Sequence, residues 1–108
     1  MEVNDYQMMA LETAIYPKEQ QVIYPTLGLT GEAGEVADKV KKVLRDNDGV
    51  FDKERKSLIM MELGDVLWYC ATLANDLGYT LEEVCQANYD KLKSRQQRGM
   101  IHGNGDNR

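Results

Sequence analysis

Two acidic pairs constrain the fold of this chain more than any other feature. They are Glu32-Ala-Gly-Glu35 and Glu62-Leu-Gly-Asp65, and the acids of each pair are three residues apart. On a helix, this spacing projects both carboxylates from one face, about one turn apart. If the two helices pack antiparallel, the four carboxylates converge. Carboxylate oxygens are the ligands that Mg²⁺ prefers, so the pattern indicates a cation site suited to metal-assisted phosphate chemistry.

The spacing of apolar residues predicts helices and no strand. We expect four helices, over residues 5–16, 26–45, 52–77 and 80–97. Asp5 is the expected N-cap of the first helix, and Pro17 marks its end. Gly78 suits the position after the third helix, and Thr80 with Glu83 forms a capping box that opens the fourth. The predicted fold class is all-α, a four-helix bundle-like domain stabilised by oligomerisation.

The predicted domain covers residues 1–99, and a polar tail of residues 100–108 follows. This tail has too few apolar groups to order itself. It is therefore either floppy or ordered by a ligand or a neighbouring surface.

The two acidic pairs are not equivalent. Glu32 and Glu35 flank the apolar stripe of their helix beside Lys39 and Lys42, and alone they could be solvated surface charges. Glu62 instead lies at the centre of an apolar stripe, with Asp65 at its edge. An unpaired carboxylate in a core costs several kcal/mol, so Glu62 must be paired, protonated or bound to a metal.

Three glycines in the second predicted helix, Gly28, Gly31 and Gly34, each cost about 1 kcal/mol of helix propensity. Their presence indicates that another helix or a ligand approaches the backbone closely.

Other residues have two interpretations each. Asn88, Lys91 and Arg95 share one face of the fourth predicted helix, where they are either ordinary polar residues or contacts for phosphate and sugar. Trp68 is either a core residue or a wall on which a base stacks beside Asp65. Lys39 is either a surface cation or a substrate contact.

Several chemistries are excluded by the residues that the chain lacks. A di-iron carboxylate bundle needs Glu-x-x-His on two helices, and the single histidine is His102 in the tail. The chain has no phosphate-binding loop with Gly-Lys-Ser/Thr, no Gly-x-Ser-x-Gly elbow and no Cys/His nucleophile arrangement. The attacking group should therefore be water.

Composition narrows the partners and the compartment. A net charge of −5 speaks against nucleic acids and anionic membranes as partners. Cys70 and Cys85 are expected to be core residues of a reduced protein. The N-terminus lacks the pattern of a signal peptide, and no apolar run approaches the ~20 residues of a membrane span. We expect a soluble, cytoplasmic protein whose thin core gains from burial against a second copy.

The motifs resemble those of a known family. Gly31-Glu-Ala-Gly-Glu-Val36 and Glu62-Leu-Gly-Asp-Val-Leu-Trp-Tyr69 look like the Glu-x-x-Glu and Glu-x-x-Asp motifs of MazG-type nucleotide pyrophosphohydrolases, in the all-α NTP pyrophosphatase superfamily. The 26 residues between Glu35 and Glu62 fit the family spacing. Asn88-Tyr-Asp-Lys-Leu-Lys-Ser-Arg95 is similar to the family's Asn-x-x-Lys-Leu-x-x-Arg element. Gly31 departs from the many members that carry a further glutamate there.

The resemblance implies hydrolysis of nucleoside triphosphates between the α- and β-phosphates, with Mg²⁺ or Mn²⁺ as cofactor. It implies that the metal ligands are carboxylates, which here would be Glu32, Glu35, Glu62 and Asp65. Glu35 and Glu62 would be catalytic, with Glu35 as the group that orients or deprotonates the water. Asn88, Lys91 and Arg95 would contact the nucleotide. From the residues themselves, we also expect Lys39 and Trp68 to contact the substrate. Family members form dimers or dimers of dimers, which implies a homodimer or homotetramer.

Two alternatives remain open from the sequence. One is a pyrophosphatase specific for dUTP or a modified dNTP, which would differ in the base pocket and not in the acids. The other is a non-catalytic, antitoxin-like or regulatory bundle that binds nucleotides through the same residues.

Overall fold

The protein is described here by a computed structural model, which describes residues 1–99 and 101–106. Its helices, in chain order, are α1 (Val3–Leu11), the short 3₁₀ helix η1 (Lys18–Gln20), α2 (Ile23–Asp46), α3 (Lys53–Asp76) and α4 (Leu81–Gln97). The described residues contain no strand, so the predicted all-α fold class is confirmed.

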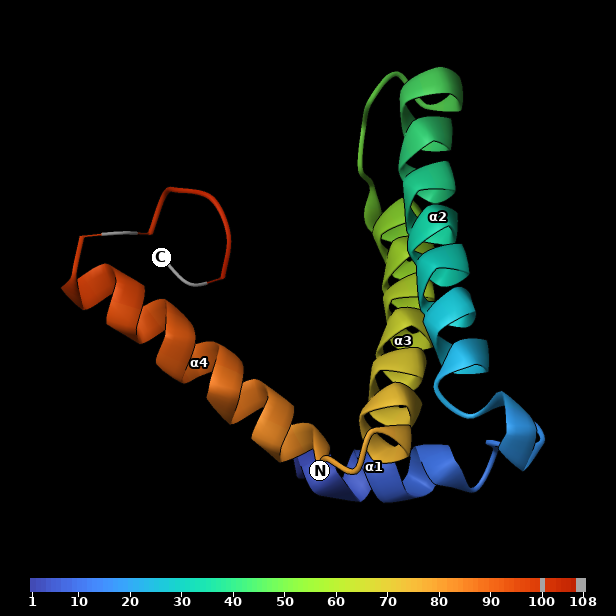
Figure 1. Ribbon diagram of the computed structural model, residues 1–108. Coiled ribbons are helices and arrows are strands. Elements are labelled where there is room, and N and C mark those ends of the chain that lie inside the picture. The colour runs from blue at the N-terminus through green and yellow to red at the C-terminus, as the bar shows by residue number, and fades with distance from the viewer. Residues whose placement is uncertain (100, 107–108) are drawn as a thin grey trace.

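The helices form a long antiparallel pair with two attached helices. α2 and α3 lie side by side over most of their length, α1 crosses the lower end of α3, and α4 extends away from the pair (Figure 1). The turn between α2 and α3 is fixed by Asn47, whose amide donates to the carbonyl of Val50 at 2.7 Å. Asp52 then caps α3 by accepting a hydrogen bond from the backbone N–H of Arg55 at 2.9 Å. This packing places the two acidic pairs on neighbouring helices.

The predicted turn and capping box at the start of α4 are confirmed. Gly78 has a φ of +87°, a left-handed conformation that glycine adopts without strain. Thr80 and Glu83 form the predicted capping box, with the Thr80 hydroxyl accepting from the Glu83 N–H at 3.1 Å and the Glu83 carboxylate accepting from the Thr80 N–H at 2.9 Å.

The predicted bounds of the first helix are wrong. Its N-cap is Glu2, and Asp5 lies three residues later, where its carboxylate accepts a hydrogen bond from the Glu2 N–H at 3.3 Å. An acid at that position completes a capping box, so Asp5 is inside the helix. The helix also ends at Leu11, well before Pro17. The chain turns early, and the Tyr16 hydroxyl donates to Asp76 at 2.9 Å near the end of α3.

A buried glutamine joins α1 to the other helices. The Gln7 side chain is 5% exposed, and its amide donates to the carbonyls of Ala71 and Tyr79, both at 3.1 Å. Its side-chain oxygen accepts from the backbone N–H of Leu81 at 3.0 Å. Gln7 therefore satisfies backbone groups at the junction of α3 and α4, which the sequence pattern did not predict.

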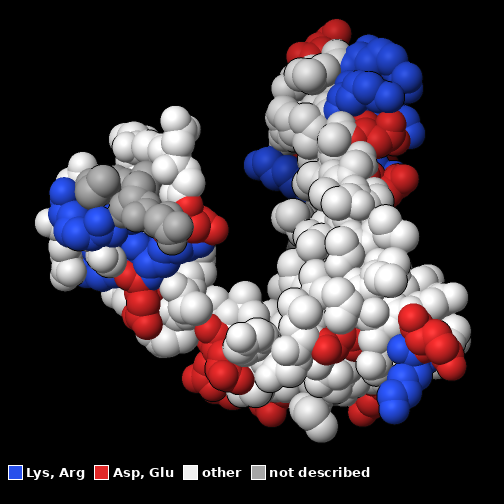
Figure 2. All heavy atoms as spheres, in the orientation of Figure 1, with Lys and Arg blue, Asp and Glu red and all other residues white. Residues whose placement is uncertain are grey.

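The core of the single chain is small. Ala10, Ala71 and Leu81 form its central cluster, and Tyr6 and Trp68 pack against it half-buried. Many large apolar side chains are exposed instead, among them Met60, Leu63, Leu67, Val84 and Leu92. Part of the surface of α3 that faces α4 is uncharged in Figure 2. A surface this apolar is typical of a face that contacts another molecule.

The expectation that both cysteines lie in the core needs revision. Cys70 is only half-buried, so its predicted core position is confirmed in part, whereas Cys85 is exposed on α4 and its predicted core position is wrong. The reason is that α4 diverges from α2 and α3, and among the described residues most of its length has no helix to pack against (Figure 1).

α3 is long and apolar enough, by length and composition alone, to match a membrane span. Glu62 and Asp65 interrupt its apolar sequence.

The glycines of α2 differ in their surroundings. A Cβ atom added at Gly28 would overlap the ring of Tyr69, whereas one added at Gly31 or Gly34 would meet no atom within 4 Å. The predicted close approach to the backbone is thus confirmed at Gly28, where the ring of α3 packs onto α2.

This difference predicts opposite effects of alanine substitution. Gly28→Ala should lower the free energy of unfolding by about 1–3 kcal/mol, because the methyl group forces Tyr69 out of its position. Gly31→Ala should raise it by up to about 1 kcal/mol, because alanine has the higher helix propensity. Urea unfolding followed by far-UV circular dichroism measures both. Equal effects of the two substitutions would contradict the packing of Tyr69 on Gly28.

Candidate metal centre

Three acids from the two long helices meet at one point. Glu32 of α2 and Glu62 and Asp65 of α3 each offer a carboxylate oxygen, and the three oxygens lie within 4.8 Å of one another. Glu32 and Glu62 are half-buried and Asp65 is exposed. The i,i+3 spacing places Glu62 and Asp65 on one face of α3, and the antiparallel packing brings that face to Glu32. The carboxylate cluster is therefore built from both acidic motifs.

The cluster concentrates negative charge. Desolvation raises the pKa of Glu32, and the charges of Asp65, Glu62 and Glu35 raise it further. One cation lies close by, since the Lys39 ammonium is 3.7 Å from a Glu62 carboxylate oxygen. The Glu62 side chain is 18% exposed, so it lies less deeply than its position in the apolar stripe indicated. A divalent cation would relieve repulsion that a single lysine only partly offsets.

Glu35 stands apart from the other predicted ligands. It is exposed and is not among the three acids that converge, although its charge contributes to the raised pKa of Glu32. Lys42 pairs with Asp38 at 2.7 Å instead of joining the acidic pairs. The structure thus brings together three of the four predicted ligands and Lys39, and the role of Glu35 stays a prediction.

A pocket of about 370 Å³ adjoins the carboxylate cluster. It is lined by Thr13, Glu32, Asp65, Trp68 and Tyr69. The indole N–H of Trp68 donates to the Thr13 hydroxyl at 2.8 Å, which fixes the ring. Trp68 packs against the small core and also lines this pocket, and its predicted role as a wall for a stacked base stays a prediction. Sequence reasoning missed Thr13, which follows α1 in the chain and approaches Trp68 only through tertiary packing.

Further aromatic rings extend from this pocket toward the loop before α2. Tyr16 stacks on Tyr24 with ring centroids 5.0 Å apart, and Tyr24 lies 6.4 Å from Tyr69. Trp68 meets Tyr69 edge to face at 4.9 Å. Desolvation and the hydrogen bond to Asp76 raise the pKa of Tyr16 to about 12, so its hydroxyl stays a neutral donor. These contacts fix the position of the loop beside the pocket.

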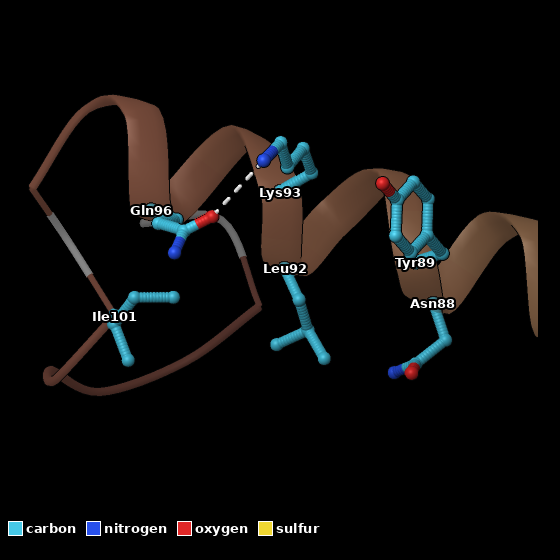
Figure 3. Close-up of a pocket in the computed structure, with 6 residues that line it drawn as sticks. All are labelled: Asn88, Tyr89, Leu92, Lys93, Gln96 and Ile101. Atoms are coloured by element: carbon cyan, nitrogen blue, oxygen red, sulfur yellow. Dashed lines mark hydrogen bonds between the residues drawn. The ribbon is translucent and has the colours of Figure 1, made fainter.

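The predicted nucleotide contacts on α4 are not brought to the carboxylate cluster within one chain. α4 diverges from α2, as Figure 1 shows, and the described pockets that contain α4 residues contain none of the three acids. Asn88 lines a surface pocket with Leu92 and Ile101 (Figure 3). Lys91 and Arg95 instead contact the tail through Asp106.

Comparisons with known proteins agree with this geometry. The MazG nucleotide pyrophosphohydrolase domain matches residues 20–100, a range that contains all four acids of the two motifs. The chain is 52% identical to the gene 37 protein of Mycobacterium phage L5, over the full length of both proteins. It is 36% identical to the uncharacterized protein YvdC of Bacillus subtilis (strain 168), over 62% of this chain and 68% of that protein. No solved structure matches the chain significantly.

The domain match extends over most of the chain, and it includes the helix pair that forms the carboxylate cluster. Proteins of this family generally depend on a divalent metal ion, in keeping with the chemistry of the cluster. The chain belongs to the MazG nucleotide pyrophosphohydrolase family.

Proposed function

We propose that this protein hydrolyses nucleoside or deoxynucleoside triphosphates to the monophosphate and pyrophosphate, with Mg²⁺ as cofactor, in nucleotide-pool housekeeping. The observation that carries the proposal is the convergence of Glu32, Glu62 and Asp65 within 4.8 Å, on the helix pair that matches the family. The adjoining pocket supplies aromatic rings beside these acids, as a nucleoside would require.

The donor set fits a hard divalent cation. All three acids of the cluster offer carboxylate oxygens, which suit Mg²⁺ or Mn²⁺. Desolvation and the charges of Asp65, Glu62 and Glu35 raise the pKa of Glu32, and a bound cation would oppose this effect by favouring the charged form. When bound, such a cation polarises a phosphoryl oxygen and lowers the pKa of a water.

The chain's own residues would supply the remaining chemistry. Glu35, one turn along α2 from Glu32, would accept the proton of the water that attacks the α-phosphorus. Glu62 would help to hold the cation and keep Lys39 oriented through the ion pair at 3.7 Å. Lys39 would then neutralise charge on the leaving pyrophosphate as the bond to the bridging oxygen breaks. Trp68 would present its ring to the base.

A second copy of the chain would complete this site. Asn88, Lys91 and Arg95 lie on α4, which extends away from the α2–α3 pair of its own chain (Figure 1). The exposed apolar residues of α3 and α4 give a second copy a surface to cover. We infer a homodimer or homotetramer in which α4 of one protomer brings Asn88, Lys91 and Arg95 to the carboxylate cluster of another.

Two other functions use the same residues. Specificity for dUTP or a modified dNTP would be set in the pocket of Thr13, Trp68 and Tyr69, since the acids act only on the phosphates. A regulatory protein would bind nucleotides without hydrolysing them.

The activity assay incubates the purified protein with Mg²⁺ and a panel of common and modified (d)NTPs. Release of pyrophosphate is the readout, and it separates these functions. Release from no member of the panel would contradict the proposed activity.

Divalent cations should stabilise the protein. At a concentration of about 100 times the dissociation constant, Mg²⁺ or Mn²⁺ should raise the free energy of unfolding by about 2.7 kcal/mol. Asp65→Asn should lose most of this gain because a ligand is removed. Asp90→Asn, which changes an acid of α4 that accepts from Gln86, should keep it. Differential scanning calorimetry with and without the cation measures the effect, and an unchanged gain in Asp65→Asn would contradict the assigned site.

Glu62→Gln should abolish turnover without unfolding the protein. Loss of one ligand should lower kcat by about 100-fold or more. The free energy of unfolding should stay within about 1 kcal/mol or increase, because the change removes one of three repelling carboxylates and only a partly exposed ion pair. Glu54→Gln, at an exposed site on the same helix, serves as the control and should keep full activity. Unfolding of Glu62→Gln during purification would instead indicate a structural role.

A further inference from the structure

The described part of the C-terminal tail, residues 101–106, folds back onto the face of α4 that carries Lys91 and Arg95. The carboxylate of Asp106 lies 3.1 Å from the Lys91 ammonium and 3.3 Å from the Arg95 guanidinium. The same Arg95 nitrogen also donates to the carbonyl of Gly105 at 3.2 Å. The two cations that the family motif assigns to the nucleotide are therefore in contact with an acid of their own chain.

The environment of the Arg95 side chain favours a bound anion. It is 4% exposed, and its Nε atom is buried without a hydrogen-bond partner among the described residues. A buried guanidinium N–H without an acceptor is costly, and a phosphate group offers more acceptor oxygens than one carboxylate. Asp106 itself is 80% exposed, so a ligand can displace it without disturbing a core.

The tail is shaped to reach this position. Gly99 and Gly105 have φ values of +69° and +81°, left-handed conformations that let the chain reverse after α4 and again before Asp106. Between these turns Ile101 lines a surface pocket with Leu92 and Gln96 of α4, as the close-up in Figure 3 shows. Lys91 and Arg95 hold the pKa of Asp106 below its usual range, so the carboxylate is charged at neutral pH.

We propose that the tail is an autoinhibitory strap, in which the Asp106 carboxylate occupies the place of a substrate phosphate at Lys91 and Arg95. A nucleoside triphosphate or pyrophosphate must displace Asp106 before these two cations can bind it. The strap lowers the apparent affinity of the two cations for substrate, and substrate displaces Asp106 as its concentration rises. The proposal rests on the proposed function in one respect, namely that Lys91 and Arg95 bind the polyphosphate of the substrate.

The test measures binding of inorganic pyrophosphate to the full-length chain by isothermal titration calorimetry. The buffer contains EDTA, so that the carboxylate cluster holds no divalent cation and contributes no attraction. Asp106→Asn should bind pyrophosphate about tenfold more tightly than the wild type, because a charged competitor is removed. Asn104→Ala, a neighbouring tail substitution that leaves Asp106 in place, should bind like the wild type.

A second substitution locates the effect. Adding Lys91→Gln to Asp106→Asn should remove most of the gain, since one of the two phosphate-binding cations is lost. If the tail has only a structural role, Asp106→Asn should not tighten binding. Loss of the tail contacts would then loosen the end of α4 and leave pyrophosphate binding unchanged or weaker. Unchanged or weaker binding in Asp106→Asn would overturn the strap, and a gain that survives Lys91→Gln would overturn its location.

Turnover measurements separate this proposal from the proposed function. If the strap acts during hydrolysis, Asp106→Asn should lower KM for the triphosphate severalfold and leave kcat unchanged. If the wild type turns over while pyrophosphate affinity and KM are the same in Asp106→Asn, the strap is wrong and the activity stands. If no variant turns over but Asp106→Asn binds pyrophosphate more tightly, the activity is wrong and the strap stands.

Discussion

The rest of the structure depends on the antiparallel packing of α2 against α3, which holds three carboxylates within 4.8 Å. Carboxylates this close repel one another, and partial burial strengthens the repulsion because less water screens it. Desolvation, followed by the charges of Asp65, Glu62 and Glu35, raises the pKa of Glu32, and the Lys39 ammonium lies 3.7 Å from a Glu62 carboxylate oxygen. The closeness of the three carboxylates therefore has two effects. It lowers the stability of the helix pair when no cation is bound, and it attracts a cation to the cluster.

In the single chain, the carboxylate cluster and the two α4 cations that we propose bind the substrate lie apart. α1 and the start of α4 are joined to α3 through Gln7, so α4 leaves the helix pair at a fixed point and extends away from it (Figure 1). Its Lys91 and Arg95 then meet Asp106 instead of a phosphate. The proposed second copy and the proposed strap address the same two cations, since one would bring them to the carboxylate cluster and the other would cover them.

Local signals in the sequence predicted those features that depend on neighbouring residues. The capping box of Thr80 and Glu83 and the turn at Gly78 need only a few consecutive residues, and both are confirmed. The N-terminal helix was misplaced because Asp5 suits two positions of a cap, and only the preceding Glu2 decides between them. Cys85 was placed in a core because periodicity identifies an apolar face but not whether another helix covers it.

The sequence by itself determined the all-α class, the two acidic motifs and the family, because i,i+3 spacing on helices fixes which carboxylates share a face. Only the tertiary structure decided which acids converge, since the approach of Glu32 to Glu62 and Asp65 depends on the register in which α2 packs along α3. It also decided the roles of Gln7 and Thr13, whose partners lie far away in the chain. Hydrogen bonds between such distant residues leave no periodic pattern in a sequence, because they depend on how whole helices pack.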